Sequence, residues 1–137
     1  MEENQKLQQI MTGQNSQMSI ISLALYIQST SRDKTIIKKC HQIIHDQHHH
    51  MIYFGQYLSK QGIDPRLWTL ENDEYTYWSP FYLNYSKVEC HNLDRLIDLL
   101  QLVNIQLKAI SVDFLQKCIN DLITKNKNHI IEIRDAN

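Results

Sequence analysis

The stretch Lys34–Gly62, KTIIKKCHQIIHDQHHHMIYFGQYLSKQG, decides the fold of this chain. Its apolar residues recur at the helical period, so they share one face of a helix over about 34–61. Gln47 falls in the same stripe. Ser31 or Asp33 can cap the helix start, and Gly62 is expected just beyond its end. The apolar members of the stripe are Ile36, Ile37, Cys40, Ile43, Ile44, Met51, Phe54 and Leu58.

Three further segments show the same periodicity, at about 3–29, 87–109 and 113–134. Gly13 weakens the first of them, because glycine inside a helix costs about 1 kcal/mol relative to alanine. Ser111 or Asp113 is the expected cap of the last. The whole chain has only 3 Gly and 2 Pro, and sheet proteins need such turn residues often. The sequence therefore predicts an all-α protein.

Four amphipathic helices of this length predict a single four-helix bundle over residues 1–137. The first and last helix pairs are separated by a few residues, so each pair is expected to be an antiparallel hairpin. The connection at about 63–86 is long enough to run the length of the bundle. We expect an ordered crossover there, with one short helical turn, joining parallel helices at 34–61 and 87–109.

Composition excludes several classes of protein. Lys and Arg total 14 against 15 for Asp and Glu, so the basic field of a nucleic-acid-binding protein is missing. No apolar run approaches the roughly 20 residues that span a bilayer. The polar start of the chain predicts a cytoplasmic location. The three cysteines are widely spaced, which argues against a disulfide framework or a thiolate zinc site, and Cys40 and Cys118 are expected as small buried apolar residues.

The two hairpins resemble the ferritin-like superfamily, whose members carry an inward Glu on the first helix of each hairpin and an inward Glu-x-x-His on the second. Gln14 stands near the position of the first Glu, and Asp46-x-x-His49 has the form of the first motif. In the second hairpin Asp94 is the candidate carboxylate, and Asn126-x-x-His129 replaces the second motif. The ending GIDP of the helix at 34–61 and the aromatic stretch after it also resemble small spore-coat ferritin-like proteins. The resemblance implies a metal-binding bundle whose ligands are degenerate here.

The direction in which these residues face changes the expectation of a metal-binding bundle. At 100° per residue, Asp46 and His49 fall on the far side of the stripe and Asp94 lies off it. The inward polar residues are neutral ones, and a dinuclear site needs carboxylates to balance two cations. We therefore expect a buried, hydrogen-bonded layer in place of a di-iron centre. Its predicted members are Gln14, Gln47, Asn126 and His129.

Five of the seven histidines lie at positions 41, 45, 48, 49 and 50. Two imidazoles at i and i+4, such as His45 and His49, can share Zn²⁺, Ni²⁺ or Cu²⁺. Further candidate ligands are His41, His48, Asp46 and His129. The alternative is a solvated or subunit-contacting helix face that binds no metal.

The segment between the hairpins is rich in Trp, Tyr and Phe. Aromatic residues dominate protein–protein hot spots, so this segment is a candidate surface for a protein partner or for self-association. Its candidate contact residues are Trp68, Tyr77, Trp78 and Phe81. The alternative is a crossover that packs only on its own bundle.

Three functions remain open. The first is a non-catalytic ferritin-like bundle that acts as a structural or partner-binding module. The second is a metal-binding protein, with oxidative chemistry at a di-metal site or binding at the histidine cluster. The third is a small regulator or inhibitor that acts through the aromatic segment. No nucleophile such as Ser or Cys sits at a catalytic motif beside the histidines and no phosphate-binding Gly-rich loop is present, so no catalytic residue is assigned and a role other than an enzyme is expected.

Overall fold

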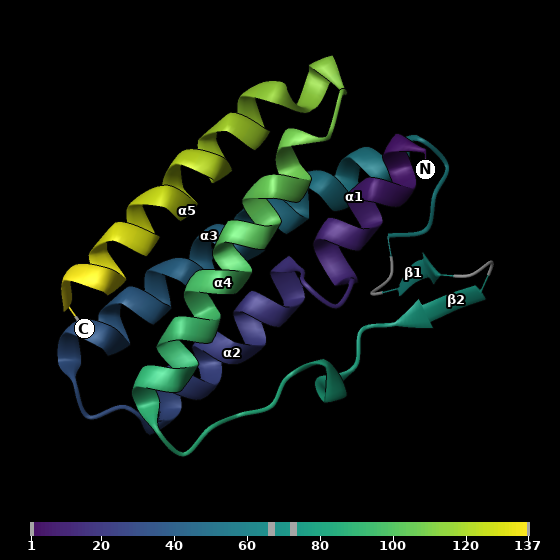
Figure 1. The fold of residues 1–137 in the computed structure, drawn as a ribbon. Coiled ribbons are helices and arrows are strands. Elements are labelled where there is room, and N and C mark those ends of the chain that lie inside the picture. Colours follow the sequence, from purple (N-terminus) through teal and green to yellow (C-terminus); the bar gives the residue numbers. More distant parts are fainter. Residues whose placement is uncertain (1, 66–67, 72–73, 137) are drawn as a thin grey trace.

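The computed structural model describes residues 2–65, 68–71 and 74–136, with the backbone alone for residues 68–71 and 74–76. Its helices are α1 (Glu3–Thr12), α2 (Gln17–Thr30), α3 (Lys34–Lys60), α4 (Glu89–Lys108) and α5 (Gln116–Ala136) (Figure 1). Short 3₁₀ helices lie at Pro80–Tyr82 and Asp113–Leu115. The all-α class predicted from the sequence is confirmed, with α1 and α2 together forming the first of four helical columns.

The four columns form a ring in which each packs on two neighbours. α2 contacts α3 and α4, and α5 contacts the same two helices. α3 and α4 both start at the end of the bundle where the C-terminus lies, and α2 and α5 run the opposite way (Figure 1). The connection from α3 to α4 passes along the outside of the bundle. Because this connection brings the chain back to the end of the bundle where α3 starts, α3 and α4 run parallel.

The first column is broken, although the sequence pattern predicted one helix over 3–29. A Cβ on Gly13 would lie 2.7 Å from the carbonyl oxygen of Gln9, so the chain approaches itself too closely there for a larger residue. Ser16 then caps α2, because its hydroxyl accepts from the amide of Ser19 at 3.3 Å. The break moves Gln14 out to the surface, so the predicted burial of Gln14 is wrong, and Gln17 becomes the buried glutamine of this column.

The ends of α3 agree with the sequence. Asp33 accepts from the amides of Thr35 and Ile36 at 2.9 and 3.3 Å. At the other end Gly62 has a φ of 78°, a left-handed conformation that favours glycine. α5 differs: neither Ser111 nor Asp113 caps it through a side chain, and a 3₁₀ turn at Asp113–Leu115 leads into the helix.

The crossover contains an antiparallel hairpin that the sequence analysis did not predict. β1 (Trp68–Glu71) pairs with β2 (Glu74–Tyr77), with Trp68 opposite Tyr77. Both strands are short and rich in aromatic residues and threonine, which favour extended backbone. The 3₁₀ helix at Pro80–Tyr82 supplies the expected helical turn, and buried Leu83 anchors the segment to the core.

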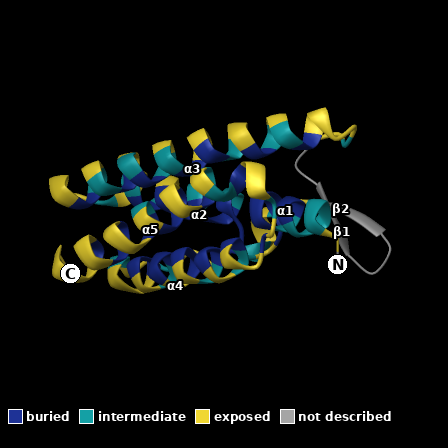
Figure 2. Ribbon diagram, turned by 90° about the horizontal axis from the view of Figure 1, so that it is seen from above, coloured by how far each residue is buried: buried dark blue, intermediate teal, exposed yellow. Residues whose placement is uncertain are grey.

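The buried residues of the helices face one another inside the bundle and the exposed ones face outward (Figure 2). Phe54, Leu58, Leu96, Leu100 and Leu122 are among the fully buried side chains. Each such side chain contributes about 1.5–3 kcal/mol by leaving water. Within the part of the chain that the structure describes, no helix is long and apolar enough to cross a membrane.

Candidate functional site: a polar layer and the seam beside it

A buried chain of side-chain amides crosses the centre of the bundle. Gln47 on α3 donates to Asn126 Oδ1 on α5 at 2.8 Å, and Asn126 donates to Asn104 Oδ1 on α4 at 2.9 Å. Asn104 in turn donates to the carbonyl of Ile123 at 3.3 Å. From α2, Gln17 Nε2 lies 3.4 Å from the carbonyl of Gln47. Each helical column therefore contributes one amide to a single polar layer, which we call the amide layer: Gln17, Gln47, Asn104 and Asn126.

The amide layer is buried and electrically neutral. Gln17, Gln47 and Asn126 have no exposed surface. Among the described side chains, the buried polar atoms without a hydrogen-bond partner are Gln17 Oε1, Gln47 Oε1 and His129 Nδ1. All three are acceptors in the state that the structure implies. Amides do not act as acids or bases near neutral pH, so this layer can position helices but cannot transfer protons.

Two histidine–aspartate pairs flank the amide layer, both joining α3 to α5. Asp46 Oδ2 on α3 lies 2.6 Å from His129 Nε2 on α5. His50 Nε2 on α3 lies 3.1 Å from Asp121 Oδ2 on α5. Because α3 and α5 are antiparallel, these contacts and the Gln47–Asn126 bond form successive rungs along one seam, the α3–α5 seam. A further rung is the ion pair between Lys39 and Glu132.

His129 is held in its neutral form. Burial lowers the pKa of His129, and the hydrogen bond to Asp46 opposes this only in part. The Asp46 carboxylate accepts, so the proton of the neutral ring lies on Nε2 and Nδ1 carries a buried, unpaired lone pair.

Both ring nitrogens of His50 have a partner, unlike those of His129. Its Nδ1 donates to the carbonyl of Asp46 at 2.8 Å, and its Nε2 faces the carboxylate of Asp121. Both partners are acceptors, so both contacts are hydrogen bonds only when the ring is an imidazolium. Burial alone would raise the pKa of Asp121, but its bonds to Lys125 and His50 outweigh burial and hold that pKa below its usual value.

The structure corrects the sequence-based site in several places. Asp46 was expected to face solvent, yet its side chain is 15 % exposed and belongs to the α3–α5 seam. Each bundle helix packs on two neighbours, so the buried arc of α3 is wider than the single stripe that faces α2. Gln47, Asn126 and His129 are buried as expected. The sequence analysis missed Gln17, His50, Asn104 and Asp121. The repeat of Gln47-x-x-His50 in Asn126-x-x-His129 was a signal that could have found His50.

The remaining histidines of the cluster point to solvent. His41, His45, His48 and His49 are exposed, and the rings of His45 and His49 stack 6.1 Å apart and almost parallel. His41, His45, Asp46 and His129 line one hollow of about 300 Å³. Across residues 2–65 and the other described ranges, no three His, Cys, Asp or Glu side chains lie together as a metal-binding group.

The candidate partner-binding residues divide into two kinds. Phe81 is 93 % exposed and Tyr77 is 57 % exposed. Trp78 is half-buried instead, and its indole donates to Ser19 Oγ at 2.9 Å. The side chain of Trp68 lies outside the described residues. Of the four predicted contact residues, Tyr77 and Phe81 are therefore the ones whose described side chains are exposed to a partner.

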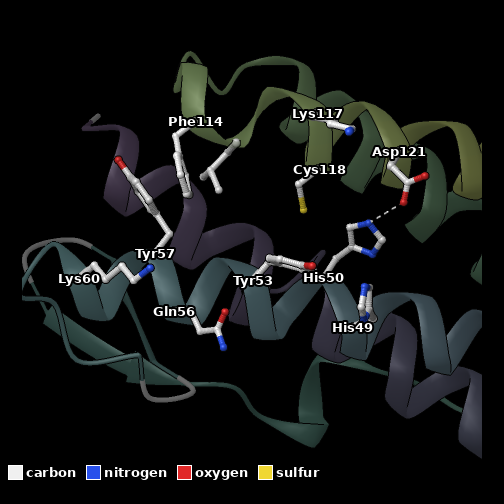
Figure 3. A pocket seen from close by; sticks show the side chains of 11 residues that line it. His49, His50, Tyr53, Gln56, Tyr57, Lys60, Phe114, Lys117, Cys118 and Asp121 are labelled. Atoms are coloured by element: carbon white, nitrogen blue, oxygen red, sulfur yellow. Dashed lines mark hydrogen bonds and ion pairs between the residues drawn. The ribbon is translucent and has the colours of Figure 1, made fainter.

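A groove of about 490 Å³ lies at one end of the α3–α5 seam, between the second half of α3 and the start of α5 (Figure 3). Its apolar lining includes the rings of Tyr57 and Phe114, which stack 6.2 Å apart. Cys118 points into the groove. Burial, followed by the charge of Asp121, raises the pKa of this thiol to about 11, so only a small fraction of Cys118 is thiolate at neutral pH and it reacts slowly as a nucleophile. The groove therefore has the size of a small-molecule binding site.

Comparison of the chain with protein-family models, with curated proteins and with solved structures finds no match.

Proposed function

We propose that this chain is a ferritin-like bundle that carries neutral amides where metal-binding members carry carboxylates, and that it acts without catalysis as a structural or partner-binding module. The amide layer is the observation that carries this proposal. It takes Gln17 from α2, Gln47 from α3, Asn104 from α4 and Asn126 from α5, and His50 and His129 follow Gln47 and Asn126 three residues later. This order resembles the superfamily pattern of one Glu and one Glu-x-x-His per hairpin, with an amide at each carboxylate position.

The helix arrangement supports the same proposal. Two antiparallel hairpins, with α3 and α4 parallel and joined by a long outer connection, are what a ferritin-like topology requires (Figure 1). Side chains of the amide layer also hydrogen-bond to one another. A buried pair of divalent cations would have to displace these amide–amide hydrogen bonds. The layer also offers no negative charge to balance the charge of the cations. The layer thus contributes to holding the four helices in one register.

Restoring the carboxylates tests the proposal. The variant Gln17→Glu/Gln47→Glu/Asn104→Asp/Asn126→Asp would place four acidic groups in one layer together with His50 and His129. We expect it to gain saturable Fe²⁺ or Co²⁺ binding, measured by calorimetry, and to gain thermal stability when the metal is present. A matched variant carries four acidic changes at exposed positions: Gln14→Glu, Asn120→Asp, Asn128→Asp and Gln56→Glu. If the first variant folds by circular dichroism and binds no more metal than the second, the ferritin-like assignment of the layer is wrong.

Weak metal binding by the exposed histidines is a second candidate, favoured by the close parallel stacking of His45 and His49. Two ligands at i and i+4 would hold Zn²⁺, Ni²⁺ or Cu²⁺ with micromolar or weaker affinity. Calorimetry on protein prepared without an affinity tag tests this, with His45→Ala expected to abolish binding and His91→Ala, on α4, expected to leave it unchanged. Equal binding by both variants would exclude this pair.

A further inference from the structure

We propose that the groove between α3 and α5 binds a small aromatic carboxylate. This site is separate from the amide layer and does not depend on the ferritin-like assignment. Its volume of about 490 Å³ falls within the range of roughly 300–1,000 Å³ that small-molecule sites occupy. The apolar lining and the charges around it indicate the class of ligand.

The apolar part of the groove is flat and aromatic. Tyr57 and Phe114 present rings at 22° to each other, and Tyr53 lies one helical turn before Tyr57 on the same side of α3 (Figure 3). Phe114 is 76 % exposed and Tyr53 is 49 % exposed, although both border a concave surface. A planar ring in the groove would cover these side chains by offset or edge-on stacking, which contributes about 0.5–1.5 kcal/mol per pair beyond area burial.

The charges around the groove favour an anion. Lys60 and Lys117 line it, and within the described part of the chain neither forms an ion pair with a carboxylate. Asp121 is the carboxylate among the lining residues, and it is already paired with His50 and with Lys125 at 3.1 and 3.2 Å. The uncompensated charge at the groove is therefore positive. A carboxylate would be attracted to the two lysines, whereas a cation would be repelled.

The chain carries its own reporter for this site. Cys118 points into the groove, whereas Cys90 is exposed on α4 and Cys40 is buried in the core. A ligand in the groove should shield Cys118 from alkylation and leave Cys90 unaffected. The probe is naphthoate, compared with naphthalenemethanol, which has the same ring system and no charge. Alkylation by iodoacetamide is carried out at mildly alkaline pH, because the raised pKa of Cys118 makes its thiolate scarce at neutral pH, and is followed at each cysteine by mass spectrometry.

We expect naphthoate at about ten times its dissociation constant to slow alkylation of Cys118 about tenfold, because only the free protein reacts. Naphthalenemethanol should protect Cys118 from alkylation only at higher concentrations than naphthoate. The variant Lys60→Ala/Lys117→Ala should weaken naphthoate binding about fivefold, the scale of two solvent-exposed lysines. The matched variant Lys38→Ala/Lys127→Ala, with the same net charge, should behave like the wild type. Phe114→Ala should weaken both probes, and Ile105→Ala, an exposed apolar residue on α4, should weaken neither.

Three results would overturn the proposal. Protection of Cys118 by neither probe would show that the groove takes no small aromatic ligand. Equal protection by both probes would show an apolar surface without an anion site, which is more suited to a protein partner. Equal slowing at Cys90 and Cys118 would show that the probe acts outside the groove.

Discussion

Gln47 on α3 donates its side-chain amide to Asn126 Oδ1 on α5 across 2.8 Å, and neither residue has any exposed surface. Asn126 also donates to Asn104, so one side chain joins three helices. Asn126→Ala would leave a buried donor and a buried acceptor without partners. We expect it to lower the free energy of unfolding by about 2–4 kcal/mol, measured by urea denaturation. Asn128→Ala, on the exposed side of the same helix, should change it by less than about 0.5 kcal/mol. Equal effects of the two substitutions would contradict a structural role for the layer.

The seam should make stability depend on pH through His129. Burial lowers the pKa of His129 in the folded chain, so below about pH 6.5 the unfolded chain binds more protons at this residue. The neutral ring therefore contributes stability above its unfolded pKa, and this contribution falls as the pH drops through that value toward the folded pKa. Asp46, Lys39 and Lys125 are the charged groups that act on the ring. Unfolding measured from pH 8 to pH 5 should show a loss in the wild type that is smaller in His129→Gln. A larger loss in the variant would show that His129 is charged in the folded state.

The break between α1 and α2 offers a matched pair of glycine substitutions. Gly13→Ala should destabilise the fold by more than about 1 kcal/mol, because its Cβ would lie 2.7 Å from a backbone oxygen of Gln9. Gly55 lies inside α3, where a Cβ would meet Pro65 and Met11 at 3.7 and 3.8 Å, which is ordinary contact. Gly55→Ala should therefore stabilise by up to about 1 kcal/mol through helix propensity. Thermal and urea unfolding of both variants test this, and a tolerated Gly13→Ala would mean that the break has another cause.

Association through the crossover should depend on Phe81 more than on Trp78. Phe81 is almost fully exposed, while Trp78 packs on the core and donates to Ser19. Phe81→Ala should weaken self-association in light scattering and leave the helical circular dichroism and the melting temperature unchanged. Trp78→Ala should instead lower the melting temperature, because it detaches the crossover from α2. A protein that stays monomeric at high concentration, in the wild type and in both variants, would show that the crossover serves only the fold.

The sequence predicted the helical class, the direction of the helices and the burial of Gln47, Asn126 and His129, because these follow from the helical period and from the lengths of the connections. Gln14 was misplaced because the four non-helical residues 13–16 shift the register, and periodicity alone assumes an unbroken helix. Asp46 was placed on the solvent side because only the apolar stripe of α3 was taken as buried. Part of the side of α3 that packs on α5 lies outside that stripe. The pairing of His50 with Asp121 joins residues 71 positions apart, and no local pattern encodes such a distance.

We propose that the amide layer binds no metal and joins the helices through neutral hydrogen bonds. Calorimetric titration of the untagged wild-type protein with Fe²⁺ under anaerobic conditions tests this claim most directly. The account predicts no saturable binding in the wild type, because four amides offer two cations no balancing charge. Tight, saturable binding of two irons per chain, lost in Asn126→Ala and retained in Asn128→Ala, would contradict it.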